Sequence, residues 1–556
     1  MKKSLALLSL VALVGCSEVQ EIGEQEVDAR EGESSVPLAA DEAVEGGDLV
    51  MALSQEPDAL DPTTARTRAG RMVFESMCEK LYDIDAEGEI IPMLATELPD
   101  YSEDETVLRV PLREDAVFSD GTPMDAEAVR TSLERHLEHP TSARSSDMGP
   151  IEEIRVVDDH EIEIELAEPF APLVATLSDR AGMIMSPQAL DELGDDFAQA
   201  PSCVGPFALV ERVPQTRIDV VADPHYYGAD EVHLDSITYV IMPDHNIRAA
   251  NLRSRDVHLT DTVSPQEFDA LVDDAAGEVN GLVLDSLGFQ GLTLNIGNVD
   301  GTGQPPGEID TVVAQEPAVR EALSLAIDRD SLVDVVFNNW YVSACTPMSP
   351  ISTFADERAT DCPEHDPDRA MELLEDAGVD IPVEIDLTVR NDQDSLRYAQ
   401  ALQASVEDAG FEFTIRPMEW TALLDAQDRG DFDAILVGWG GMIDPHNNLH
   451  NYFSTGAGNN YSGLSDPEID EYLDEAARTV DHDERVELYG QAVERAGELN
   501  NIIVTYRLSN LGAAHESIAG VWFSPDGILR VSGAAFVDTE AAEEEIDIDE
   551  LDLGDD

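Results

Sequence analysis

Residues 430–470 contain the side chains whose types and spacing best fit ligand chemistry. An apolar run at 434–437 predicts a buried strand, which leads into a loop rich in Gly, Asp and Asn before a helix that begins near Pro467. Loops at strand ends commonly carry binding residues. Here Trp439 offers a large apolar face, and Asn460 supplies amide donors and acceptors. An ordinary surface turn is the alternative that these residues leave open.

Four further side chains could add polar chemistry. His446 and His450 are four residues apart, so on a helix they would share a face and could chelate a metal. A polar surface is the more common reason for such a pair, and no third ligand is evident, so we expect no metal and no other cofactor. Tyr461 could hydrogen-bond a ligand or fix the loop. Arg390, at the end of a predicted strand at 385–389, could meet a ligand carboxylate or lie on the surface.

The two ends of the chain predict export and a flexible attachment. Lys2 and Lys3 precede an apolar run at 5–14 that is too short to span a bilayer, which is typical of a signal peptide at residues 1–15. Residues 13–16, Leu-Val-Gly-Cys, resemble the bacterial lipobox, which implies cleavage before Cys16 and lipidation of its thiol. Residues 16–47 would then be a lipidated, acidic linker, and residues 540–556 an acidic disordered tail.

The other four cysteines are candidates for disulfide bonds, which an oxidising exterior favours. Cys345 and Cys362 flank a Pro- and Ser-bearing loop and form the first candidate pair. Cys78 and Cys203 form the second. Free buried cysteines are the alternative.

The charge balance is the outlier of the composition. Of 556 residues, 117 are acidic and 32 are basic, a formal net charge of -85. Such self-repulsion opposes a compact state unless concentrated salt screens it, so we interpret the surface as that of a halophile. No basic patch remains to meet phosphates, which argues against nucleic acid as a partner.

Predicted helices and strands alternate without a short repeat, which indicates an α/β or α+β protein of roughly three or four domains rather than a solenoid. Strands are expected at residues 49–53, 106–112, 154–157, 161–166, 217–221 and 237–241. Helices are expected at residues 69–81, 125–136, 317–327, 366–377, 465–477 and 483–496.

Several segments, taken in order from about Leu49 to Val521, resemble the family-5 solute-binding proteins of ABC importers, which bind oligopeptides, dipeptides or nickel. The segments are SQEPDALDP (54–62), LREDAVFSDGTPMDAEAVRTSLER (112–135), PAVREALSLAIDRDSLV (317–333), DPDRAMELLEDAG (366–378) and residues 430–470 with the Arg485 to Tyr489 motif. The resemblance implies an α/β fold of two lobes joined by a hinge, as in periplasmic binding proteins (class C, type II), with an additional inserted domain. Lobe I would comprise residues 48–81, 200–288 and 504–539, the inserted domain 82–199, and lobe II 289–503.

The resemblance also assigns roles within the loop. In the peptide-binding members an aspartate three residues after the loop tryptophan takes the α-amino group of the ligand; in this chain the third residue after Trp439 is Met442. Asp444 belongs to the following Asp-Pro pair and could line the pocket or cap the next turn. If Met442→Asp gains affinity for peptides and loses the native solute, this loop sets the substrate class. Asn295 matches a strand asparagine of the family and is expected to be structural.

The sequence therefore predicts a monomeric, extracytoplasmic lipoprotein that captures a small solute, such as a short peptide, and delivers it to an ABC permease. Two alternatives are a non-peptide solute, such as a metal chelate or an oligosaccharide, and a role as a ligand sensor. A secreted hydrolase is a third. The chain has no Gly-x-Ser-x-Gly elbow, no His-Glu-x-x-His and no phosphate loop, so we expect no enzyme activity.

Overall fold

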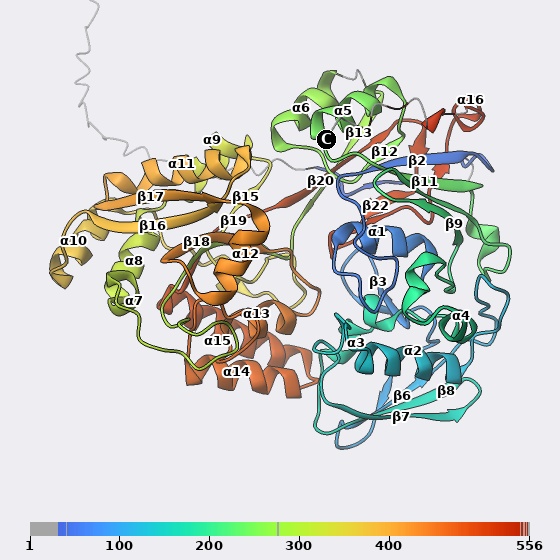
Figure 1. Ribbon diagram of the computed structural model, residues 1–556, viewed down its shortest axis with the longest axis horizontal. Coiled ribbons are helices and arrows are strands. Elements are labelled where there is room, and N and C mark those ends of the chain that lie inside the picture. The colour runs from blue at the N-terminus through green and yellow to red at the C-terminus, as the bar shows by residue number, and fades with distance from the viewer. Residues whose placement is uncertain are drawn as a thin grey trace, which may run out of the picture.

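The computed structural model describes residues 32–39, 42–274, 277–544, 546–548, 551 and 553. Two bodies, each built on a sheet flanked by helices, lie side by side, and a smaller sheet lies below the right-hand body in Figure 1. This arrangement confirms the expected α/β fold of two lobes with an inserted domain. Cys16 and the apolar run before it lie outside the described residues. Among the helices described, none is both long enough and apolar enough to cross a membrane.

Lobe I is built on a seven-stranded mixed sheet with β2 (Asp48–Leu53) at its centre. The strand order is β13 (Val279–Asp285), β20 (Ser509–His515), β12 (Leu259–Thr260), β2, β11 (Ser236–Ile241), β10 (Arg217–Ala222) and β9 (Phe207–Val213). Both neighbours of β2 run parallel to it, and residues 49–53 are all buried. A continuous apolar run is typical of a strand that is covered on both faces.

Helices and small sheets complete lobe I. Thr67 caps α1 (Arg68–Met77) by accepting a hydrogen bond from Gly70 N (3.2 Å), and α1 ends four residues before the predicted helix because the backbone is extended at Cys78. The other elements are α5 (His245–Ser254), α6 (Pro265–Asp274), α16 (Thr539–Ala542), the 3-10 turn η3 (Ala229–Glu231), a sheet of β1 (Ser35–Val36), β22 (Val521–Phe523) and β23 (Leu529–Arg530), and a sheet of β21 (Ile518–Ala519) and β24 (Ala535–Phe536).

The inserted domain packs α2 (Ala126–Glu138) against a four-stranded antiparallel sheet. The sheet has the order β5 (Asp100–Tyr101), β6 (Val107–Pro111), β8 (Glu161–Leu166) and β7 (Ile151–Asp158). In β8 the apolar residues are buried and the glutamates between them are half-buried, so the period-2 pattern turns one face to the core. The domain also contains β3 (Tyr82–Ile84), β4 (Ile90–Pro92), α3 (Leu173–Thr176), α4 (Pro187–Leu193), η1 (Arg180–Gly182) and η2 (Gly194–Gln199).

Residues on both sides of the expected boundary at residue 199 are buried in the core of the neighbouring domain. Met183, Met185 and Phe197 are buried in the core of lobe I, whereas Val204 is buried in the core of the inserted domain. The disulfide Cys78–Cys203, with a Cα–Cα distance of 4.9 Å, ties the end of α1 to this segment. The two cores are therefore contiguous, and the inserted domain is attached to lobe I over a broad contact.

Lobe II is built on a six-stranded sheet and nine α-helices among the described residues. The strand order is β15 (Val342–Ser343), β19 (Ile502–Arg507), β14 (Phe289–Leu294), β18 (Ala434–Trp439), β16 (Val383–Arg390) and β17 (Phe411–Met418). The helices are α7 (Val312–Gln315), α8 (Pro317–Ala326), α9 (Arg329–Phe337), α10 (Pro367–Ala377), α11 (Gln393–Glu407), α12 (Trp420–Arg429), α13 (Pro445–Phe453), α14 (Pro467–Arg478) and α15 (His482–Leu499), with the 3-10 turn η4 (Glu357–Ala359). The disulfide Cys345–Cys362 closes the loop after β15.

The chain crosses between the lobes at two adjacent places. The first crossing, residues 286–288, joins β13 to β14, and the second, Leu508, joins β19 to β20. Ser286 N donates a hydrogen bond to Leu508 O (2.9 Å), so the crossings are bonded to each other. The expected second boundary at residue 504 is wrong, because residues 504–507 continue β19 and pair with lobe II strands.

Both ends of the described chain are more ordered than expected. Val36 in β1 pairs with Val521, and Val44 bridges to Phe536, because both valines pack against the core of lobe I. The described residues of the acidic tail include α16, and four apolar residues (Ile546, Ile548, Leu551, Leu553) pack against the core beside α5 and α6. The predictions of a flexible linker and a disordered tail are therefore wrong for these residues.

Candidate functional site

The segment after β18 lies directly on the interlobe crossing. Gly440 O accepts a hydrogen bond from Ser286 Oγ (3.2 Å). Gly441 has φ +87°, and a Cβ there would lie 2.4 Å from Gly288 N, so a larger residue would collide with the crossing backbone. A ligand bound at this edge of the sheet would therefore lie beside the crossing about which the two lobes rotate.

Asn448 of α13 fixes the conformation of this segment. Its Oδ1 accepts hydrogen bonds from Trp439 Nε1 (2.8 Å) and Met442 N (2.7 Å), and its Nδ2 donates to Met442 O (2.7 Å). The Trp439 ring packs against Tyr452, with centroids 5.6 Å apart. The indole at the end of β18 is thereby held by helix α13.

Asp444 is engaged within lobe II. It caps α13 by accepting from His446 N (2.9 Å), and both of its carboxylate oxygens lie 2.8 Å from Arg485 Nη2. Burial alone would lower the pKa of Arg485, but the Asp444 carboxylate raises it above its usual value. Tyr489 OH, 2.7 Å from the same Nη2, completes a buried cluster. Asp444 thus has its charge compensated without a ligand.

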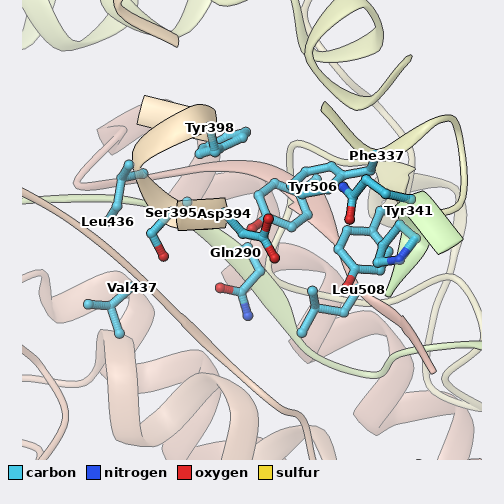
Figure 2. Close-up of a pocket in the computed structure, with 13 residues that line it drawn as sticks. Gln290, Phe337, Tyr341, Asp394, Ser395, Tyr398, Leu436, Val437, Tyr506 and Leu508 are labelled. Carbon is cyan, nitrogen blue, oxygen red and sulfur yellow. The ribbon is translucent and has the colours of Figure 1, made fainter. Parts of the chain in front are cut away.

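A cavity of about 210 Å³ opens between the lobes beside β14, β18 and β19. We call it the aromatic pocket, because Figure 2 shows Phe337, Tyr341, Tyr398 and Tyr506 along one wall. Tyr506 lies 4.8 Å from Phe337 and 5.0 Å from Tyr398, measured between ring centroids. The remaining lining residues are Pro265, Gln266, Gln290, Gly291, Asp394, Ser395, Leu436, Val437 and Leu508.

Polar groups also line the aromatic pocket. Asp394 and Ser395 come from the first turn of α11, which Asp392 caps, and Gln290 comes from β14. Figure 2 shows Asp394 and Gln290 beside the Tyr506 ring. The Asp394 side chain is 54% exposed and pairs with Arg397 (3.0 Å), so it stays accessible to a solute. A pocket with aromatic faces and a few polar groups suits an organic solute of mixed character.

A second, smaller cavity of about 20 Å³ lies where lobe I, the inserted domain and lobe II meet, with room for about one water. We call it the arginine pocket; it is lined by Arg71, Arg144, Asp147, Ala175, Thr176, Ser178, Asp179, Ala181, Met442, Ile443, Asp444, Asn447 and Asp526. Arg71 bridges Asp179 (3.1 Å) and Asp526 (2.6 Å). Burial alone would raise the pKa of Asp179, but Arg71, then Arg180 and Arg144, hold it far below its usual range.

Two sets of contacts hold the lobes together on either side of the crossings. On one side Trp340 of lobe II packs on Phe268 of α6, with centroids 4.5 Å apart. On the other side the inserted domain meets lobe II, where Ala171 N donates to Ala477 O (2.8 Å) and Phe170 packs edge-on to His446 (5.5 Å). We call this second set the jaw contact. Arg478 and Glu168 add an exposed ion pair to it (2.9 Å).

The residues expected to bind ligand divide into two groups. Met442 and Asp444 line the arginine pocket, and Trp439 adjoins it through Asn448. Arg390 lies outside both pockets, paired with Asp392 (2.9 Å) and lying over the Trp420 ring. Asn460 and Tyr461 also lie outside both pockets. The Asn460 amide donates to Ser454 O and Leu464 O, and Tyr461 OH donates to Asn459 Oδ1, so these side chains have partners within the loop.

The histidine pair is part of the packing of α13. The His446 and His450 rings stack with centroids 4.5 Å apart. Burial, and then the proximity of His450, lower the pKa of His446 to about 3. Across the described residues, no group of three or more His, Cys, Asp or Glu side chains is placed to hold a metal ion. Asn295 donates to Asn298 O (3.0 Å) and Gly430 O (2.8 Å), bonds that brace the loop.

Sequence reasoning missed most of the pocket residues. The aromatic wall draws Phe337, Tyr341, Tyr398 and Tyr506 from three separate segments of lobe II. The arginine pocket draws Arg71 from α1 and Arg144 from the loop after α2. One available signal was the scarcity of basic residues, because an arginine among small and apolar residues in so acidic a chain needs a specific reason.

Three comparisons with known proteins agree with this geometry. Probable di/tripeptide-binding protein 5 of Pseudomonas aeruginosa (strain UCBPP-PA14) is 28% identical over 452 residues, covering 75% of this chain and 81% of the relative. The structure of AgaA from A. tumefaciens R10, in complex with agropinic acid, is 25% identical with a TM-score of 0.73, covering 88% of this chain and 98% of AgaA. The ABC transporter substrate-binding protein CtaP of Listeria monocytogenes has a TM-score of 0.78 at 19% identity, covering 89% of this chain and 100% of CtaP, a likeness of fold.

The family model described as bacterial extracellular solute-binding proteins, family 5, middle region, matches residues 89–460. That range covers more than half of the chain and includes most of the inserted domain, most of lobe II and the segment after β18. The two lobes, the paired crossings and the pockets between them accord with a protein that closes on a solute. The chain therefore belongs to family 5 of the bacterial extracellular solute-binding proteins.

Proposed function

We propose that this protein captures a short peptide or a peptide-like solute between its lobes and presents it to an ABC importer. The observation that carries the proposal is the aromatic pocket, whose walls come from both lobes and from Leu508 at the crossing. A solute there would touch both lobes, so binding would favour the closed form over the open form. Relatives named as di/tripeptide-binding proteins support a peptide as the solute.

A non-peptide organic solute is the second candidate. It is favoured by Met442, which stands where the peptide-binding members carry an aspartate, and by the likeness to AgaA in complex with agropinic acid. Because the family is one of solute-binding proteins, turnover of the solute is not expected. The two candidates differ in whether the backbone amides of a peptide are needed for affinity.

Calorimetric titration with a panel of di- and tripeptides, in molar NaCl to screen the acidic surface, tests the proposal. We expect saturable heats for a subset of peptides and a rise in the unfolding midpoint with ligand concentration. Tyr506→Ala should weaken binding, whereas Val335→Ala, a change at a residue that is 73% exposed, should not. If no peptide binds while native mass spectrometry finds a bound non-peptide solute, the second candidate replaces the first.

We also propose that Cys16 is lipidated and holds the protein on the outer face of a membrane. The apolar run at 5–14 and the lipobox-like residues 13–16 support this proposal. Metabolic labelling with palmitate should mark the wild type and not Cys16→Ala. Label on the variant would contradict the proposal.

A further inference from the structure

The described residues that follow α16 turn apolar side chains toward lobe I and an acidic one toward solvent. Four apolar residues of this tail are half-buried and pack against a core cluster of lobe I: Ile546, Ile548, Leu551 and Leu553. Asp547, between the first two, is exposed. Residues 543–556 contain nine acidic residues and no basic one. The tail therefore combines an apolar contact, which favours docking, with a concentration of negative charge.

The tail packs on the opposite face of the central sheet from the core that α16 contacts. Along β2, Met51 is buried in the core against which Ala542 of α16 packs, whereas Val50 and Ala52 are buried in the cluster that the tail covers. Successive side chains of a strand point to opposite faces, so the two cores lie on opposite faces of the sheet. In Figure 1 α16 lies on the side of lobe I away from lobe II, and α6 lies nearer to lobe II. The tail therefore leads from the outer edge of lobe I toward the other lobe.

Helix α6 connects the cluster under the tail to lobe II. Phe268 and Leu271 of α6 are buried members of this cluster, and Trp340 and Tyr341 of lobe II pack against it.

Two hydrogen bonds also join α6 to lobe II. Gln266 Nε2 donates to Val336 O (2.9 Å), and Trp340 Nε1 donates to Asp269 Oδ1 (3.2 Å). The helix that the tail supports thus also contacts the other lobe, so a change in the docking of the tail would act on the contact between the lobes.

Salt concentration should decide whether the tail is docked. In dilute salt the negative charge of the tail is repelled by a chain of net charge -85, and this repulsion opposes docking. The Debye length is about 10 Å at 0.1 M salt and about 3 Å at 1 M, so concentrated salt removes most of the repulsion and leaves the apolar contact. Four half-buried side chains form a much smaller contact than the cores of lobe I. On lowering the salt, the tail should therefore be released before lobe I unfolds.

We propose that Ile546, Ile548, Leu551 and Leu553 form a salt-dependent clasp on lobe I. When docked, the clasp braces α6 and, through α6, the contact between the lobes at Trp340. When released, it leaves α6 with fewer contacts and allows the lobes to separate more readily. Closure of the lobes would then respond to the salinity of the surroundings. This role goes beyond solute capture and does not depend on which solute is bound.

Hydrogen exchange of the solute-free protein across a series of NaCl concentrations, with circular dichroism in parallel, tests the clasp. We expect the C-terminal peptide to lose protection at a salt concentration at which β2 and β11 remain protected, and α6 to exchange faster at the same point. Ile546→Ser with Ile548→Ser should lower the protection of the tail by at least about tenfold in molar NaCl. Val210→Ser, at a residue of β9 that is 64% exposed, is the matched control and should change nothing.

A charge variant separates repulsion from apolar contact. Glu543 and Glu544 are both exposed, and changing both to glutamine removes two negative charges without touching the apolar residues. The tail of this variant should therefore stay docked at a lower NaCl concentration than the tail of the wild type. An unchanged salt dependence would contradict the role of charge in release.

Deletion of residues 545–556, which keeps α16, tests the effect on the lobes. Small-angle X-ray scattering of the solute-free deletion variant in molar NaCl should give a larger radius of gyration than the wild type under the same conditions. Equal values would show that the tail does not brace the lobes. In the wild type, which needs no substitution to fold, loss of tail protection only together with global unfolding would overturn the clasp. Protection that rises with protein concentration would place the tail on a second copy and would also overturn it.

Discussion

The aromatic pocket and the arginine pocket lie at the same interface and are built in opposite ways. The first is a cavity of about 210 Å³ with aromatic and aliphatic walls, and the second has room for about one water among six ionisable side chains. Apolar surface attracts solutes without fixed direction, so a roomy aromatic pocket tolerates side chains of different sizes. Charged groups in a small, dry space demand one geometry. The aromatic pocket would therefore admit solute side chains of different sizes. The arginine pocket would accept a group of only one size and orientation.

The largest effect is expected from Asp444→Asn, which tests whether the arginine pocket is preformed. The substitution leaves Arg485 buried with no carboxylate, which typically costs about 3–5 kcal/mol. Denaturant unfolding in molar NaCl should show a clearly lower midpoint. Unchanged stability together with lost solute binding would mean that Asp444 serves the ligand rather than the fold.

Acidification should destabilise the side of the molecule that carries the arginine pocket. His446 is held neutral, with a pKa of about 3, so the folded state binds fewer protons than the unfolded state below the unfolded pKa of about 6.5. The contribution of His446 to the free energy of unfolding is fully present above that pH. It falls by about 2 kcal/mol between pH 7 and pH 5. His446→Phe should therefore unfold at a lower pH than the wild type, and the exposed His225→Phe should not. Identical acid transitions for His446→Phe and the wild type would show that this imidazole titrates normally.

In the aromatic pocket, Tyr506→Ala should reduce affinity for solutes with an aromatic side chain by about tenfold, which corresponds to about 1.4 kcal/mol. Tyr506→Phe, the matched control, keeps the ring and should stay close to the wild type. Calorimetry with one peptide series of graded side-chain size measures the effect. A uniform loss across the series would indicate that the ring supports the hinge rather than the choice of solute.

The smallest effect is expected at the jaw contact. Glu168→Gln removes an exposed ion pair with Arg478, and such pairs are worth at most about 1 kcal/mol. We expect a shift in affinity of less than about fivefold that disappears in concentrated salt. Fluorescence titrations at two salt concentrations provide the measurement. A larger, salt-independent loss would mean that the jaw contact, and not the pockets, supplies most of the energy of closure.

Much of the fold was readable from local patterns, because buried strands and capped helices leave short-range signals. The apolar run at 434–437 and the alternation at 161–166 correspond to β18 and β8. Helix α13 was not predicted, since its Asn- and His-rich sequence has a low apolar content, although Asp444 and Pro445 form a typical helix start. The Val504–Arg507 segment was assigned to the wrong lobe because a strand that leads into a crossing has the same pattern on either side of it.

The pockets were less accessible to sequence reasoning for a physical reason. Arg71, Arg144, Met442 and Asp526 come together only through the packing of three bodies. Composition indicates that an arginine is present, but not which partner faces it. The binding role of the loop after Trp439 stays a prediction. Its asparagines bond within lobe II, since Asn448 bonds to the Trp439 indole and to Met442 N, and Asn460 donates to a backbone carbonyl.

The hydrogen bond between Ser286 and Leu508 has a mechanical consequence. Two strand crossings pinned at one point act as a pivot, so relative motion of the lobes reduces to rotation about an axis near that bond. Under such a rotation the displacement of a residue grows in proportion to its distance from the axis. Paired spin labels at residues 168 and 478, at the far rim, would therefore report small angular changes as the largest change in separation, while labels near residue 287 would remain almost still.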